Sequence, residues 1–283
     1  METIQPLIPY GYEFRESDEK NAKEYLSRRE KTAQALSSLV DALMKDAAEE
    51  ITKICYRYGI DPQRFTISSA YNEKMFDEVA AVLDQLEEEI MDLTLDYATR
   101  CTEDKERKKS LLPWILLLGR GNRNLQQTLE TRIKMFVKDL EALIVSMSMT
   151  KRNLQEAVTK IKSSLHTVYV TPEVRNAFNR SVKMQAKYIR EKGIKHGNVG
   201  NSNSEANNIL RFVKMTVQMA WMKSQIMDFG EQEAVGYVVR RGSSYPCDLC
   251  DSHVGYHDIS DTEGFPQFHG HCLCIAIPVY KIE

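Results

Sequence analysis

The sequence predicts a mainly α-helical protein, with an elongated helical region over residues 1–195 and a small α+β module over residues 205–283. In the first region, apolar residues recur at alternating three- and four-residue steps, the spacing of helices that pack against one another. After Gly230 the period changes to that of strands, in "AVGYVVRR" and in "CLCIAIPVY". Residues 196–204 are rich in Gly, Asn and Ser and predict a linker between the two regions.

The N-terminal elements follow from local signals. The first 15 residues contain two prolines and a glycine and predict an extended arm. A long helix is expected over residues 17–58, because Gly59 and Pro62 stop it. A second helix begins near Tyr71 and carries a coiled-coil-like apolar stripe of Phe76, Val79, Leu83, Leu86, Ile90, Leu93 and Tyr97.

Four more helical segments are expected. "LLPWILLLG", residues 111–119, is too short for a membrane span and predicts a buried connector helix. A third long helix, with a kink allowed, is predicted over residues 125–165 from a second apolar stripe. Further helices are expected over residues 172–193, which begin with a proline and end at a glycine, and over residues 205–229. The second stripe comprises Leu125, Leu129, Ile133, Phe136, Leu140, Leu143 and Met147.

Composition limits the class of protein. The 283 residues are 42% hydrophobic and 28% charged, which is ordinary for a folded soluble chain. No stretch reaches the roughly 18 consecutive apolar residues of a membrane span, and the N-terminus lacks the basic-then-apolar order of a secretion signal. We therefore expect a protein made in the cytoplasm, with no membrane partner. Its paired cysteines then serve as metal ligands or redox thiols rather than as disulfides.

The net charge of -2 conceals an asymmetry. Residues 1–100 carry 12 Lys and Arg against 21 Asp and Glu, whereas residues 151–195 carry 11 against 3. One interpretation is two solvated helix faces. The other is a basic surface for nucleic acid or an acidic partner. The residues expected to contact double-stranded DNA in that case are Arg175, Arg180, Lys183, Lys187 and Arg190.

Four of the six cysteines fall in one C-terminal stretch. Cys247 and Cys250 form a Cys-x-x-Cys pair, and His269 and Cys272 form a second pair 18 residues further on. Zn²⁺ prefers about four nitrogen and sulfur ligands in a tetrahedron, commonly from two such short motifs. These four residues are the predicted zinc ligands, and Cys274 is an alternative fourth ligand. His271 is a spare candidate that would point away if this segment is extended.

The loop that carries these residues gives the metal a structural use. It contains four aspartates and a glutamate and few large apolar residues, so it cannot fold around a core of its own. A structural Zn²⁺ contributes on the order of 10 kcal/mol in small sites of this type. We expect it to hold the two predicted strands together.

Other chemistries are open for the same residues. A redox Cys-x-x-Cys begins a helix in a βαβ unit, which this loop does not resemble. A nucleobase deaminase needs an upstream His-x-Glu, and the upstream histidines stand in "HTV" and "HGN". A zinc-dependent nuclease or toxin domain on a helical delivery region would use His253, His257 or Asp258 as acid or base. A host DNA-associated adaptor with a zinc ribbon is a third alternative.

The residues from the linker to the C-terminus resemble the phage Mu F-like family of minor head, or head morphogenesis, proteins. The resemblance rests on "GYVVRRGSSYPCDLCDSHVG" and "FPQFHGHCLCIAIPVY", which follow a helix as they do in that family. Gly255 falls where the family's glycine comes after the second cysteine. Val254 replaces the aspartate common before that glycine, and Gly270 and Leu273 replace a proline and an arginine.

The resemblance implies a structural role rather than an enzymatic one. Such proteins bind the portal or the inner face of the capsid, lie inside the head of the virion in several copies, and associate with packaged DNA. The basic residues 151–195 would then contact phosphate or the acidic lumen of a portal. The acidic helices would serve docking or assembly.

Overall fold

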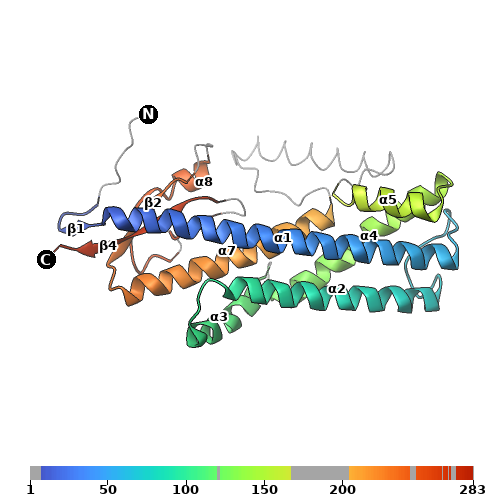
Figure 1. Cartoon of the computed structure of the whole chain (residues 1–283), viewed down its shortest axis with the longest axis horizontal. Coiled ribbons are helices and arrows are strands. Elements are labelled where there is room, and N and C mark those ends of the chain that lie inside the picture. The colour runs from blue at the N-terminus through green and yellow to red at the C-terminus, as the bar shows by residue number, and fades with distance from the viewer. Residues whose placement is uncertain are drawn as a thin grey trace.

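The structure is a computed structural model of the chain, and it is mainly helical with a small sheet at one end (Figure 1). The long helices lie along the long axis, and the strands gather at the end where β1 and β4 meet. The residues that it describes are 8–119, 122–166, 204–242, 247–262, 264–266, 268 and 272–282. The predicted fold class is confirmed.

Two long helices form one side of the bundle. Helix α1 spans Glu16–Tyr58 and packs against α2, which spans Glu73–Thr99. Gly59 ends α1 with a φ of 81°, a conformation that favours glycine. The side chain of Asn72 accepts a 3.0 Å hydrogen bond from the Met75 N–H and caps α2. The buried stripe of α1 consists of Ala33, Leu36, Val40, Met44, Ala48 and Ile51.

Helix α3, Lys105–Leu117, contains the apolar run predicted as a buried connector. The helix is present, but only one face of it is covered. Leu111 and Ile115 are buried, whereas Leu117 is 74% exposed. No helix among the described residues is both long enough and apolar enough to span a membrane.

The structure divides the third predicted helix into two. Helix α4 spans Leu125–Met149, and α5 spans Leu154–Ser164. Between them Lys151 has a φ of 53°, and the Asn153 side chain accepts a 2.9 Å hydrogen bond from the Glu156 N–H. The asparagine therefore caps a new helix instead of continuing the first, which an apolar stripe alone does not reveal.

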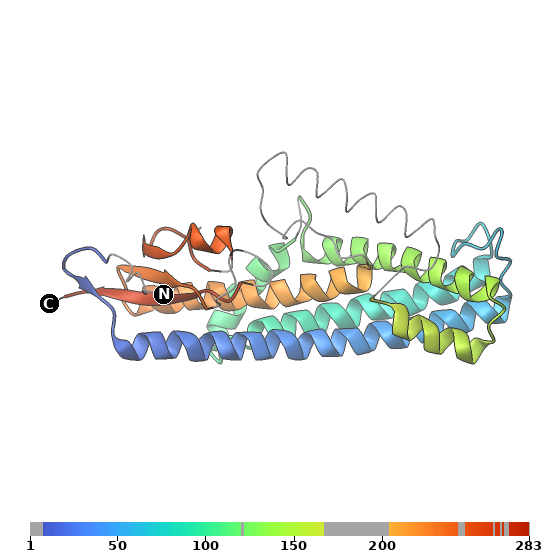
Figure 2. The ribbon, with the colours of Figure 1, turned by 90° about the horizontal axis from the view of Figure 1, so that it is seen from above.

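Helix α7, Glu205–Glu231, joins the bundle to the sheet. Its first two thirds pack against α1, α2 and α4 in the main core, and Phe229 near its end belongs to the core beside the sheet. Figure 2 shows α1 at one edge of the bundle and α4 at the opposite edge. Apart from Ser204, the predicted linker 196–204 lies outside the described residues, and the predicted division into two regions stays a prediction.

The four strands form one antiparallel sheet in the order β1-β4-β2-β3. Strands β2 and β4 are the two predicted from the sequence, whereas β1 and β3 are not predicted. In the register of the sheet, Val238 of β2 lies opposite Ile277 of β4 and Tyr256 of β3. The strands are β1 (Tyr12–Glu13), β2 (Gly236–Arg240), β3 (Gly255–Asp258) and β4 (Ile275–Lys281).

Alternation along β4 sends its side chains to two different cores. Ile275 and Ile277 pack with Ala22 of α1, and Ala276 packs in the core that contains the C-terminal cysteines. Successive side chains in a strand point to opposite faces. Cys272 and Cys274 precede β4 at two-residue steps from Ala276, so their side chains face that second core.

Candidate metal centre

The Cys-x-x-Cys pair lies on a single helical turn. Helix α8 spans Asp248–Asp251, with Cys247 at the position just before it and Cys250 within it. The Cys247 carbonyl accepts a 2.8 Å hydrogen bond from the Asp251 N–H, which closes the turn. Cys247 is half-buried, and Cys250 is buried and faces the start of β4.

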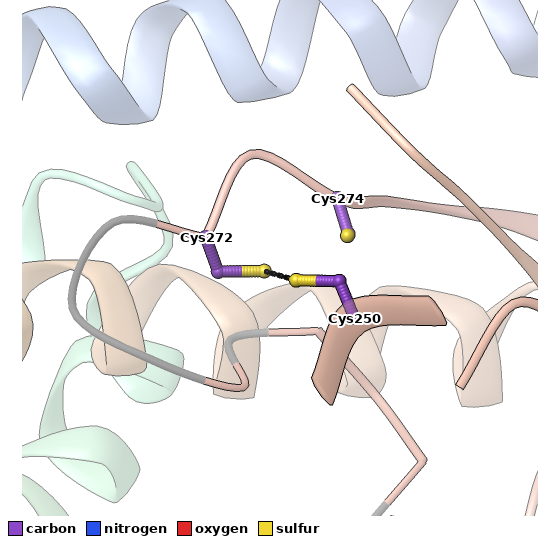
Figure 3. A group of neighbouring side chains, drawn as sticks. All are labelled: Cys250, Cys272 and Cys274. Carbon is purple, nitrogen blue, oxygen red and sulfur yellow. Dashed lines mark hydrogen bonds between the residues drawn. The ribbon is translucent and has the colours of Figure 1, made fainter. Parts of the chain in front are cut away.

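Three cysteine sulfurs converge between α8 and the start of β4 (Figure 3). The Sγ atoms of Cys250, Cys272 and Cys274 lie within 4.8 Å of one another, and those of Cys250 and Cys272 are 3.9 Å apart. All three residues are buried. Sulfurs about 2.3 Å from a tetrahedral Zn²⁺ stand about 3.8 Å from each other. The cluster can therefore hold a metal ion, with the Cys250–Cys272 pair near the spacing expected around zinc, and none of the six cysteines forms a disulfide.

The thiols of the cluster resist ionisation. Burial, the neighbouring Cys272 and a hydrogen bond with the Cys247 side chain raise the pKa of the Cys250 thiol to about 12. A hydrogen bond with Cys272, together with burial, raises the pKa of Cys274. Crowded thiolates repel one another in a buried site, and a divalent cation removes that repulsion. The hydrogen bond of Cys250 with Cys247 also places the fourth cysteine beside the cluster.

The predicted ligands are only partly within the described residues. Two of the predicted ligands, Cys250 and Cys272, and the alternative ligand Cys274 lie in one cluster. His269 and His271 lie outside the described residues. Which residue supplies the fourth ligand, Cys247 or His269 included, stays a prediction.

Two arginines flank the cluster, and sequence reasoning does not find them. Arg29 of α1 is 3% exposed, and its Nη2 donates a 2.9 Å hydrogen bond to the Cys272 carbonyl. Arg241 pairs with Asp251, donates to the Cys247 carbonyl at 3.4 Å, and interacts electrostatically with the cysteine sulfurs. Four thiolates around Zn²⁺ carry a net charge of about -2. The two guanidinium groups can offset that charge, because buried charges need partners.

The polar residues that an enzyme would use have structural partners. Both ring nitrogens of His257 are engaged, Nδ1 with Asp261 Oδ2 at 2.8 Å and Nε2 with the His253 carbonyl at 2.9 Å. The His253 ring stacks on Phe268 with 4.2 Å between centroids. Asp258 accepts hydrogen bonds from the N–H and the hydroxyl of Ser260. These groups shape the loop around the cysteines.

The predicted DNA-contacting residues, from Arg175 to Arg190, lie outside the described residues. In the described part of the basic region, Lys162 pairs with Asp46 at 3.4 Å and with Glu49 at 2.7 Å. These two ion pairs attach α5 to α1, so this lysine already has partners within the fold. Comparison with known proteins yields no match to a family model, to a curated protein or to a solved structure.

Proposed function

We propose that the chain is a phage minor head protein, a structural component that binds the portal or the capsid interior inside the virion. In this proposal several copies take part in the assembly, the C-terminal cysteines hold one structural Zn²⁺, and the helical bundle provides docking surfaces. The protein has no catalytic role of its own.

Burial of the cysteine cluster is the observation that supports a structural metal. Cys250, Cys272 and Cys274 are at most 3% exposed, and Arg29 of α1 closes the site from the side of the bundle. A catalytic zinc keeps one position open to water, whereas structural zinc sites are closed and rich in thiolate. When bound, Zn²⁺ would supply the charge that keeps the thiolates together. The chain's own residues would fix α8 against the start of β4.

The local backbone supports the resemblance to the Mu F-like family. Helix α7, strand β2, the Cys-x-x-Cys turn and strand β4 follow in the order that the resemblance requires. Gly255 has a φ of 138°, which favours glycine over other residues, and it stands where the family's glycine is found. The engaged ring nitrogens of His257 favour this reading over a nuclease.

The proposal is tested on the assembled particle and on the portal. We expect the full chain to co-purify with the portal protein encoded in the same genome and to be recovered from purified heads. Cys250→Ser should reduce both, because the C-terminal module loses its metal. Absence from heads together with no binding to the portal would overturn the proposal.

Two further measurements separate the rival functions. A nuclease would cleave linear DNA in the presence of Zn²⁺, and His257→Gln would abolish that cleavage without removing the metal. The proposed structural protein cleaves nothing. Contact with packaged DNA through the basic segment predicts binding that falls steeply with salt and is lost when Arg180 and Lys183 are replaced by Gln. No binding at low salt would remove DNA from the list of partners.

A further inference from the structure

An apolar groove runs between α2 and α4 on the helical bundle. Its volume is about 1130 Å³, and its lining residues on α2 extend from Phe76 to Asp92. That interval corresponds to about 24 Å of helix. Phe76 is 37% exposed, an unusual position for a large aromatic side chain within an otherwise packed stripe. The apolar lining comes from both helices and from the segment between α1 and α2, and comprises Ile67, Phe76, Ala80, Leu83, Met91, Ile133 and Val137.

The rim of the groove is acidic. Six carboxylates line it against two lysines, and one of those lysines, Lys134, already pairs with Glu130 at 2.5 Å. Burial, helped by the negative charges of Glu130 and Asp84, raises the pKa of Glu87. The carboxylates therefore act on one another without enough cations to balance them. The acidic rim residues are Asp84, Glu87, Glu88, Asp92, Glu130 and Glu141.

We propose that the α2–α4 groove binds a basic amphipathic helix of a partner protein. A groove with an apolar floor between two helices can accept a third helix at the usual packing distance of about 8–10 Å. An occupant of about 16 residues spans the groove at 1.5 Å per residue. Its apolar face covers the floor around Phe76, and its Lys or Arg side chains reach the carboxylates on the rim.

The charge of the groove excludes one class of partner and leaves another to be tested. Phosphate backbones are repelled by six carboxylates, so nucleic acid does not fit this surface. The chain's own residues 172–193 are basic, so the experiment tests them as a competing occupant. The proposal gives the assembly role proposed above a docking surface. Binding of a helix in the groove requires neither zinc nor the portal. The groove proposal and the proposed head function can therefore fail independently.

The test uses the full chain and a synthetic peptide. The probe is a fluorescein-labelled peptide of about 16 residues with Leu and Ala on one helical face and Lys on the other. Fluorescence anisotropy follows its binding, and a peptide of the same composition in scrambled order is the control for simple charge attraction. We expect saturable binding of the amphipathic peptide that weakens with salt, and at least tenfold weaker binding of the scrambled one.

Variants of α2 locate the binding surface. Asp84→Asn/Glu88→Gln should weaken binding about three- to tenfold, the usual range for two exposed charge contacts. Ala80→Arg puts a long cation on the half-buried floor and should abolish binding. The matched control, Glu73→Gln/Asp77→Asn, makes the same charge change on exposed positions of α2 outside the groove and should change the affinity less than twofold.

Three results would overturn the proposal. The first is no saturable binding by the folded chain. The second is equal weakening by the groove variant and by its matched control, which means attraction to acidic protein in general. The third concerns a chain with five basic residues changed to Gln. If that chain binds the probe more than tenfold tighter than the wild type, its own segment occupies the groove, whereas unchanged affinity supports a separate partner. The five residues are Arg175, Arg180, Lys183, Lys187 and Arg190.

Discussion

Arg29 links the helical bundle to the metal centre, and its replacement gives the most informative single substitution. Its buried guanidinium donates a 2.9 Å hydrogen bond to the Cys272 carbonyl from 243 residues away in the chain. Arg29→Met keeps most of the buried volume and leaves that carbonyl without its donor. A buried unsatisfied acceptor costs about 1–3 kcal/mol. That range corresponds to about a 5- to 150-fold change in an equilibrium constant.

The free-energy cost of the unsatisfied Cys272 carbonyl should appear as weaker zinc binding. Cys272 is one of the proposed ligands, so the hydrogen bond from Arg29 to its carbonyl holds that ligand in place for the metal. We expect the zinc dissociation constant, measured by competition with a colorimetric chelator, to rise by the factor given above. Arg29→Lys should recover part of the loss, because an ammonium group can still donate.

A neighbouring arginine provides the control. Arg28 is exposed on the same helix and lies over the Tyr25 ring, so Arg28→Met removes one charge without touching the loop. Its zinc affinity should match that of the wild type, and circular dichroism should show intact helices in both variants. Equal zinc affinity of the Arg29→Met and Arg28→Met chains would refute the reasoning.

Two further predictions concern the helical bundle. Burial, helped by the negative charge of Glu205, raises the pKa of Asp139 to about 6, so the folded state holds this proton more tightly than the unfolded chain. The contribution of Asp139 to stability should therefore fall as pH rises from about 4 to 6. In urea unfolding, the stability difference between wild type and Asp139→Asn should change by about 2 kcal/mol over this range, and a difference that does not change with pH would contradict this. Arg107 of α3 donates to Asp228 and, at 2.5 Å, to Glu231 of α7. Arg107→Ala should lower the free energy of unfolding by about 1–2 kcal/mol. An unchanged denaturation midpoint would show that these two ion pairs do not stabilise the fold.

Helical period sufficed for α1, α2 and α7, because their buried faces are continuous, but it did not reveal the break between α4 and α5. Val79, Leu86 and Ile90 of the predicted stripe on α2 are all buried. The same period could not show that Phe76 and Leu83 of that stripe line an open groove. Periodicity identifies the apolar face of a helix but not whether another element covers each part of that face.

Strands β1 and β3 could not be predicted from the sequence for a different reason. Tyr12–Glu13 has two residues, and Gly255–Asp258 reads "GYHD", which lacks the apolar alternation of a half-buried strand. Both owe their conformation to pairing with another strand: β1 pairs with the distant β4, and β3 pairs with β2 across the loop that carries the Cys-x-x-Cys turn. The residue pattern within a short segment does not show which strand will pair with it.

Spacing alone suggested Cys250 and Cys272 as ligands, because short Cys-x-x-Cys and His-x-x-Cys motifs place side chains locally, and it left Cys274 as an alternative. It could not suggest Arg29, which reaches the site only through the packing of α1 against the last strand. One signal was present: Arg29 stands on the same face of α1 as Ala22, Ala33 and Leu36, at three- and four-residue steps. A buried charge needs partners, and Arg29 has two: the adjacent Glu30, 3.4 Å from its Nε, and the Cys272 carbonyl.

The zinc content of the purified full chain tests the central claim most directly. Mass spectrometry under native conditions should find one zinc per chain in the wild type and none in Cys250→Ser, and a chelator should selectively increase amide exchange in β4. A metal-free wild-type chain whose β4 exchanges at the same rate with and without chelator would contradict the claim that zinc holds this end of the molecule together.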